Sequence, residues 1–186
     1  MKASVFIASS LDGFIARENG DIDWLSVAEE GRPDRDPAED YGYSAFFATV
    51  DALVMGRDTY EKVLTFGQWP YGTTPVVVLS SRPIDIPEHM AGTVESTTAA
   101  PAAIVENLTS RGLKHAYIDG GRTIQSFLAA GLLDRLIVTR IPVLIGSGRP
   151  LFGPLPHDVR LRHVRTTDFP NGLVQSEYAV VRTRPD

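Results

Sequence analysis

The sequence contains no cysteine in its 186 residues. This absence excludes structural disulfides, thiolate zinc sites and cysteine nucleophiles. Four histidines are present, at positions 89, 115, 157 and 163, but no two of them are spaced like metal ligands, so we expect no metal site. No Ser-His-Asp arrangement is visible either.

Long apolar runs and clusters of basic residues are also missing. No segment reaches the roughly 18 consecutive apolar residues that a membrane-spanning helix requires, and the apolar run after Met1 is too short for a signal peptide. The 18 Lys and Arg residues against 23 Asp and Glu residues give a net charge of −5. We therefore expect a cytoplasmic protein whose main partner is neither a membrane nor a nucleic acid, although this balance still permits a local basic pocket.

The rest of the composition is that of a globular domain, with 43% apolar and 22% charged residues. Without a repeat, a low-complexity tract or a linker, residues 1–186 are expected to form one domain. Apolar, β-prone runs predict strands at 5–8, 52–55, 74–79, 93–96, 115–118 and 136–140. Helices are predicted at about 38–49, 58–64, 101–110 and 122–130, and loops at 9–23 and 142–156.

The C-terminal part follows a different pattern. Two long β-prone segments, 159–167 and 173–183, are separated by Phe169-Pro-Asn-Gly172. Asn-Gly between two such segments is a strong signal for a hairpin. Elsewhere the order of elements is mostly β-α-β. We therefore predict an α/β protein with a three-layer α/β/α fold, in which a mostly parallel sheet closes with a C-terminal antiparallel hairpin.

Three of the predicted strands end in turns that suit an anionic ligand. Glycine lets a phosphate approach the backbone, a helix start offers unpaired N–H groups, and serine and arginine side chains hold further oxygens. Because ligands of open α/β sheets bind at the carboxyl ends of strands, we predict one phosphate-binding edge for a dinucleotide such as NADPH. The turns are Gly56-Arg57-Asp58-Thr59, Ser80-Ser81-Arg82 and Gly120-Gly121-Arg122-Thr123.

The alternative is that these glycines and serines close ordinary turns. The sequence also has no GxGxxG motif after its first strand, which excludes the standard Rossmann fingerprint. Any dinucleotide must therefore bind by another arrangement.

Two carboxylates are candidates for acid–base chemistry. Asp40 precedes the residues Phe46 and Phe47 on a predicted helix, so it can reach the mouth of the sheet and hold a heterocycle or relay a proton. The alternative is an acid that simply occupies a helix start. Asp12 is the reserve candidate, and its alternative is an Asp-Gly turn. Trp24 either stacks on a ligand ring or covers the core.

Four motifs occur in a specific order and spacing: Ser10–Ala16, Val54–Glu61, Asp119-Gly120-Gly121 and Ile141–Gly148. In this order and spacing, the chain resembles the dihydrofolate reductase-like superfamily. Within it, the chain is most similar to the reductase domain of bifunctional riboflavin-biosynthesis deaminase/reductases and its stand-alone relatives. The resemblance covers nearly the whole chain. The zinc signature of the deaminase half needs cysteine ligands and is not found in these residues.

The resemblance implies NADPH as the hydride donor. The first turn would bind the cofactor phosphates, the second the adenosine 2′-phosphate, and the double-glycine turn the diphosphate. Ala8 and the loop 13–22 would cover the nicotinamide. The implied cofactor-binding residues are Ala8, Gly56, Arg57, Thr59, Ser80, Ser81, Arg82, Gly120, Gly121, Arg122 and Thr123.

The resemblance also implies a small heterocyclic substrate, of pyrimidine or pterin type, and a homodimer. Asp40, with Asp12 in reserve, would orient or protonate this substrate, and Trp24 and Phe47 would wall it. Arg149 is a candidate for a substrate phosphate, with a solvated loop residue as the alternative. Two other functions stay open: dihydrofolate reductase activity, and a nucleotide- or flavin-binding module without turnover.

Overall fold

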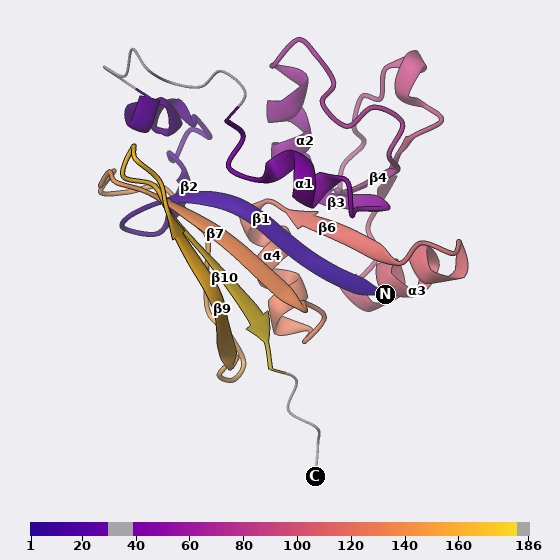
Figure 1. Cartoon of the computed structure of the whole chain (residues 1–186). Coiled ribbons are helices and arrows are strands. Elements are labelled where there is room, and N and C mark those ends of the chain that lie inside the picture. The colour runs from indigo at the N-terminus through magenta and orange to yellow at the C-terminus, as the bar shows by residue number, and fades with distance from the viewer. Residues whose placement is uncertain (30–38, 182–186) are drawn as a thin grey trace.

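The computed structural model describes residues 1–29 and 39–181, and its centre is an eight-stranded sheet (Figure 1). The strands lie in the order β5-β4-β3-β6-β1-β7-β10-β9. Their bounds are β1 Lys2–Ser10, β3 Ala52–Gly56, β4 Val76–Leu79, β5 Val94–Thr97, β6 His115–Asp119, β7 Arg135–Ile141, β9 Leu161–Asp168 and β10 Val174–Val180. A separate short pair joins β2 Phe14–Ala16 to β8 Arg149–Pro150.

Helices cover both faces of this sheet, as expected for three layers (Figure 1). Helices α3 and α4 share one apolar cluster with Val54 of β3, while α1 and α2 share another with Leu53 and Met55. Successive residues of β3 thus point to opposite, equally buried faces, which explains its uniformly apolar sequence. The helices are α1 Tyr43–Phe47, α2 Arg57–Leu64, α3 Pro101–Ser110 and α4 Gly121–Ala129, with 3₁₀ turns η1 Asp23–Glu29 and η2 Glu88–Met90.

The predicted fold class is confirmed. Strands β5, β4, β3, β6, β1 and β7 run parallel to one another, and β10 is antiparallel to both β7 and β9. Gly172 closes the β9–β10 hairpin with a φ of 80°, a backbone angle that glycine adopts without strain. Residues 182–183, included in the predicted final strand, lie outside the described residues.

Three predicted elements need correction. The loop expected at 9–23 contains the end of β1 and all of β2, and the loop expected at 142–156 contains β8. The helix expected at about 38–49 is only α1, and residue 38 lies outside the described residues. The physical reason is the left-handed backbone at Tyr41 and Gly42, with φ of 56° and 83°, which an α-helix cannot contain. In the described part of the chain, no helix is both long and apolar enough to cross a membrane.

Candidate functional site

The three anion-friendly turns meet at one edge of the sheet. Strands β4, β3 and β6 are direct neighbours and run parallel, so their carboxyl ends lie side by side (Figure 1). The turns at Gly56 and Gly120 also interlock. A Cβ on Gly120 would overlap the hydroxyl of Thr59, and a Cβ on Gly56 would lie 3.3 Å from the hydroxyl of Thr123. The predicted juxtaposition of these turns is thus observed.

Bare backbone is present where α4 begins. Gly120 has a φ of 85°. Gly56 and Gly120 are the N-cap residues of α2 and α4, and no side chain caps either helix start. A helix start without a cap leaves its first amides to water or to a ligand. Gly121 is packed closely from the other side, since a Cβ there would lie 3.0 Å from Ile15 and from the carbonyl of Pro150. The glycine turn is therefore fixed in place.

In the turn after β4, one residue stabilises the turn and two others are exposed to solvent. The hydroxyl of Ser80 accepts the amide of Arg82 at 3.1 Å and donates to the Arg82 carbonyl at 2.6 Å. Ser80 therefore closes the turn. Ser81 and Arg82 are exposed. These two side chains are the ones suited to an added phosphate.

Basic side chains gather at the start of α2. Arg57 lies 3.5 Å from both Asp58 and Glu61, and Arg149 donates to Asp58 at 2.7 Å. Arg149 thus lies beside the start of α2, and its role in holding a substrate phosphate stays a prediction. A bound phosphate would compete with Asp58 for both guanidinium groups. Arg122, in the first turn of α4, is exposed.

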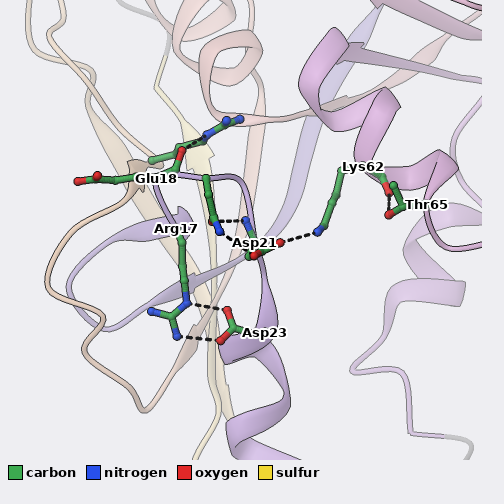
Figure 2. Close-up of polar contacts among 8 residues, drawn as sticks. Arg17, Glu18, Asp21, Asp23, Lys62 and Thr65 are labelled. Atoms are coloured by element: carbon green, nitrogen blue, oxygen red, sulfur yellow. Dashed lines mark hydrogen bonds and ion pairs between the residues drawn. The ribbon is translucent and has the colours of Figure 1, made fainter.

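A loop bridges from β2 to α2 across this edge (Figure 2). Arg17 pairs with Asp23 inside the loop at 2.6 Å, and Lys62 of α2 pairs with Asp21 at 3.1 Å. These four side chains are all at least one third exposed, so each pair adds little stability by itself. Together they hold the segment that the family resemblance assigned to covering a nicotinamide.

The sheet itself opens beside these turns. Strands β1 and β6 pair only from Lys2 to Ser4, and Ser4↔Tyr117 is the last matched position. Beyond it, the hydroxyl of Tyr117 donates to the carbonyl of Phe6 at 2.8 Å. Residues 6–8 of β1 are partly exposed, including Ala8, even though β1 is a central strand. We call this opening the β1–β6 gap.

Asp119 is a functional candidate that the sequence analysis did not name as a site residue. It ends β6 beside the gap, and its Oδ1 accepts the Gly120 amide at 2.8 Å. Burial raises the pKa of Asp119 to about 6, against the lowering effect of hydrogen bonds from Gly120 and Tyr117. Such a carboxyl exchanges a proton near neutral pH. A signal was present in the sequence, since an acid directly precedes the double glycine.

The two carboxylates named from the sequence are both engaged in local hydrogen bonds. Asp40 accepts the amides of Gly42 and Ser44 at 2.9 and 2.7 Å, and contacts with Ser44, the largest influence, lower its pKa. Asp12 accepts the Ser10 hydroxyl at 2.5 Å and the Gly146 amide at 2.8 Å, and these bonds lower its pKa. Both stay ionised near neutral pH, which suits anchoring a chain segment better than donating a proton. Their catalytic roles stay predictions.

Trp24 and Phe47 lie in different surroundings. Trp24 is 1% exposed and packs with Ile141 and Leu173, so its ring covers a small core cluster. Its Nε1 is buried and has no hydrogen-bond partner within the described residues. Phe47 stacks on Tyr43 at 5.7 Å between ring centroids and stays partly exposed. Of the two, Phe47 is the better placed to contact a ligand ring.

The residues present fit a dinucleotide cofactor. Two uncapped helix starts and the bare Gly120 backbone suit a diphosphate, Ser81 and Arg82 suit a further phosphate, and the β1–β6 gap suits a flat ring. The described residues hold no group of three or more metal-ligating side chains that could bind a metal ion.

Comparison with known protein families identifies one that spans most of the chain. The model of the RibD C-terminal domain matches residues 2–175. This chain belongs to the RibD C-terminal domain family. The uncharacterized protein YwjB of Bacillus subtilis (strain 168) is 38% identical over 173 residues, which cover 90% of this chain and 92% of the relative. Membership places the chain among the riboflavin-type, reductase-like proteins.

Solved structures of family members agree with the fold. A candidate riboflavin biosynthesis protein from Shewanella sp. PV-4 superposes with a TM-score of 0.88 at 38% identity, covering 98% of this chain and all of that one. The bifunctional diaminohydroxyphosphoribosylaminopyrimidine deaminase/5-amino-6-(5-phosphoribosylamino)uracil reductase of Thermotoga maritima gives 0.70 at 15% identity, covering 97% of this chain and 56% of that one. At that identity the likeness shows the fold alone.

Proposed function

We propose that this protein is an NADPH-dependent reductase of the riboflavin-biosynthesis type, acting on a pyrimidine- or pterin-like substrate. The observation that carries the proposal is the position of the interlocked turns at Gly56 and Gly120 beside the β1–β6 gap. The turns would bind the diphosphate of a cofactor, and the gap would hold the flat ring of the same cofactor. Membership of a reductase-like family supports the same class of reaction.

Several residues would hold this cofactor. The amides at the starts of α2 and α4 would face the diphosphate, with Arg57 nearby, and Ser81 and Arg82 would hold the 2′-phosphate. Ala8 would line the floor beneath the ring. When bound, NADPH supplies a hydride.

The remaining chemistry belongs to side chains of this chain. Asp119, at the gap, is the group that we propose donates a proton to the substrate, because its pKa of about 6 leaves a protonated fraction near neutral pH. Asp40 would act on the substrate only after release from its own helix start, or through water. Phe47 would contact one face of the substrate ring.

The reaction that names the family reduces a phosphoribosylamino-pyrimidine, and 5-amino-6-(5-phosphoribosylamino)uracil is therefore the first substrate to assay. Dihydrofolate is the second, for the dihydrofolate reductase alternative. A nucleotide- or flavin-binding module without turnover is the third possibility, and it differs from the others in giving binding without cofactor oxidation.

The deciding experiment is a titration of the purified chain with NADPH and NADH, followed by quenching of tryptophan fluorescence. We expect micromolar binding of NADPH and at least tenfold weaker binding of NADH. Failure to bind either one would mean that the turns close ordinary loops. The homodimer implied by the family stays a proposal as well, and sedimentation velocity distinguishes it from a monomer.

A further inference from the structure

Tyr41 has a left-handed backbone, with a φ of 56°, and it is the only residue other than glycine with a positive φ among the described residues. This conformation is costly for a residue with a side chain, so surrounding contacts must hold it in place. Gly42 follows with a φ of 83°, and α1 begins at Tyr43. The conformation of Tyr41 therefore sets the direction in which the chain enters α1.

Three contacts on Tyr41 come from the β9–β10 hairpin, far away in the sequence. Asn171 donates its side-chain amide to the Tyr41 hydroxyl at 2.8 Å, and Gln175 donates to the Tyr41 carbonyl at 3.1 Å. The ring of Phe169 lies edge-on to the Tyr41 ring, with 5.0 Å between centroids. We call Tyr41, Phe169, Asn171 and Gln175 the Tyr41 lock, because the hairpin holds both the backbone and the side chain of the strained residue.

Gln175 also fastens the Tyr41 lock to the central sheet. Its side-chain nitrogen carries two hydrogens, and it donates to the hydroxyl of Thr139 at 3.0 Å as well as to Tyr41. Gln175 and Thr139 are paired between β10 and β7, and Thr139 is paired on its other side with Ala8 of β1. Thr139 is buried and Gln175 is half-buried. Tyr41 is therefore tied to the rigid part of the fold.

Helix α1 depends on such external support. It has only five residues, and a helix of that length is not stable by itself in water. Phe46 packs on Phe6 and Tyr117, each at 5.2 Å between centroids, which holds the later part of the helix. The bonds that Asp40 accepts from Gly42 and Ser44 lie within the entry turn and move with it. The Tyr41 lock is what joins this turn to the hairpin.

We propose that Asn171 and Gln175 are positioning residues for the reaction. By holding Tyr41 in its left-handed conformation, they fix α1, and with it the ring of Phe47, beside the β1–β6 gap. The inference rests on the reductase function above and adds to it two residues that act only through Tyr41. Strained backbone persists where a site requires a fixed geometry, and here it stands two residues before the helix that carries Phe47.

The first test is steady-state kinetics of the full chain with 5-amino-6-(5-phosphoribosylamino)uracil and saturating NADPH. Tyr41→Phe removes the hydroxyl that Asn171 contacts, and Gln175→Met removes both donated bonds at nearly constant volume. In each variant we expect the KM of the pyrimidine to rise at least fivefold, kcat to change less than threefold, and the Kd of NADPH to change less than twofold. A merely structural tie would lower Tm and leave this KM unchanged.

Two further variants assign the effect to the Tyr41 lock. Adding Asn171→Ala to Tyr41→Phe should raise KM no further, because both changes remove the same bond. Ser176→Ala is the matched control. Ser176 is next to Gln175 on β10, faces the opposite side of the sheet and bonds to Thr166 at 3.1 Å within the hairpin. It should lower Tm and leave KM unchanged. An equal rise of KM in Ser176→Ala would overturn the proposal, since it would trace the effect to hairpin stability.

The second test needs no turnover. Hydrogen–deuterium exchange followed by mass spectrometry should show amides of α1 exchanging at least tenfold faster in Gln175→Met than in the parent, with α4 unchanged. Unchanged exchange in α1, or faster exchange with an unchanged KM, refutes this inference alone. A parent that oxidises NADPH with neither the pyrimidine nor dihydrofolate refutes the reductase function. The substrate role of the Tyr41 lock then falls with that function, even where exchange shows that the lock holds α1.

Discussion

The hydroxyl of Thr59 fills the space in which a side chain on Gly120 would begin. The contact joins the first turn of α2 to the turn before α4, and Thr123 makes the reciprocal approach to Gly56 at 3.3 Å from a Cβ built there. Two segments that are about sixty residues apart in the sequence are thus fitted to each other through glycine and threonine. A side chain on Gly120 would have to displace the Thr59 hydroxyl, and one on Gly56 would press against the Thr123 hydroxyl.

Substitution of this glycine should disrupt the cofactor edge. In Gly120→Ala, the added methyl meets Thr59 at a backbone φ of 85°, so strain and overlap add up to about 2–4 kcal/mol of lost stability. NADPH affinity should fall at least tenfold. Thermal unfolding and fluorescence titration measure the two effects.

Gly112→Ala is the control for this prediction. Gly112 has a similar φ of 82°, but no atom lies within 4 Å of the Cβ that would be added. It should lose only the strain of the left-handed backbone, about 1–2 kcal/mol, and keep its NADPH affinity. Equal losses in the two variants would mean that the contact with Thr59 is unimportant.

Arg82 should decide between the two nicotinamide cofactors. Its guanidinium is exposed in the turn after β4, where a 2′-phosphate would lie. We expect Arg82→Ala to lose about 1.5–3 kcal/mol of NADPH binding, which is roughly tenfold or more, and to leave NADH binding unchanged. Parallel titrations with both cofactors measure the ratio, and Arg162→Ala on exposed β9 serves as the control. A ratio unchanged from the parent would place the 2′-phosphate elsewhere.

Asp119 should make stability depend on pH in an unusual direction. Its folded pKa of about 6 lies above the ordinary value of 3.8, so the folded protein binds the proton more tightly. Stability falls as pH rises from about 4 to 6, and the loss is complete above that window. Asp119→Asn removes this cost and should stabilise the chain by an amount on the order of 2 kcal/mol at pH 7.5, with no gain below pH 3.8. Urea unfolding at both pH values measures the difference, and a gain that is the same at both would argue against a buried ionisation.

Glu177 should show the opposite dependence. It accepts bonds from Arg135 at 2.6 Å and Arg165 at 2.9 Å, and these contacts, with Arg135 the largest, lower its pKa. The stability that it contributes is therefore present above its ordinary pKa of 4.5 and is lost as pH falls through the lower folded value. Glu177→Gln should cost about 1–3 kcal/mol at pH 7 and less in acid.

The control for this prediction is Glu95→Gln, because the Glu95–Arg111 pair is exposed on both sides. Glu95→Gln should lower the free energy of unfolding by less than about 0.5 kcal/mol. Equal losses for Glu95→Gln and Glu177→Gln would mean that the double arginine contact adds nothing to an ordinary surface pair.

The sequence predicted features that depend on nearby residues. The strand at 52–55 and the helix at 101–110 follow from apolar runs, a first-turn proline and a following glycine, and all of these act locally. The joint position of the turns at Gly56 and Gly120 followed from a general rule for parallel sheets. The resemblance to a known family then indicated which ligand they suit.

Features that depend on distant parts of the chain were missed. Asp119 becomes unusual only because β1 leaves β6 after Ser4, and because Tyr43 and Tyr71 arrive from other segments. Nothing in its neighbouring sequence encodes that burial. Asp40, by contrast, looked suited to catalysis, yet local bonds to Gly42 and Ser44 account for its environment.

The β1–β6 gap has a mechanical consequence. The eight-stranded sheet consists of two four-stranded halves, and only three residue pairs, Lys2↔His115 to Ser4↔Tyr117, join their backbones. This narrow join lies at the end of the sheet opposite the glycine turns that follow β3 and β6. A molecule inserted at that edge would bridge the two halves where the backbone does not, so occupancy and stiffness of the sheet would rise together.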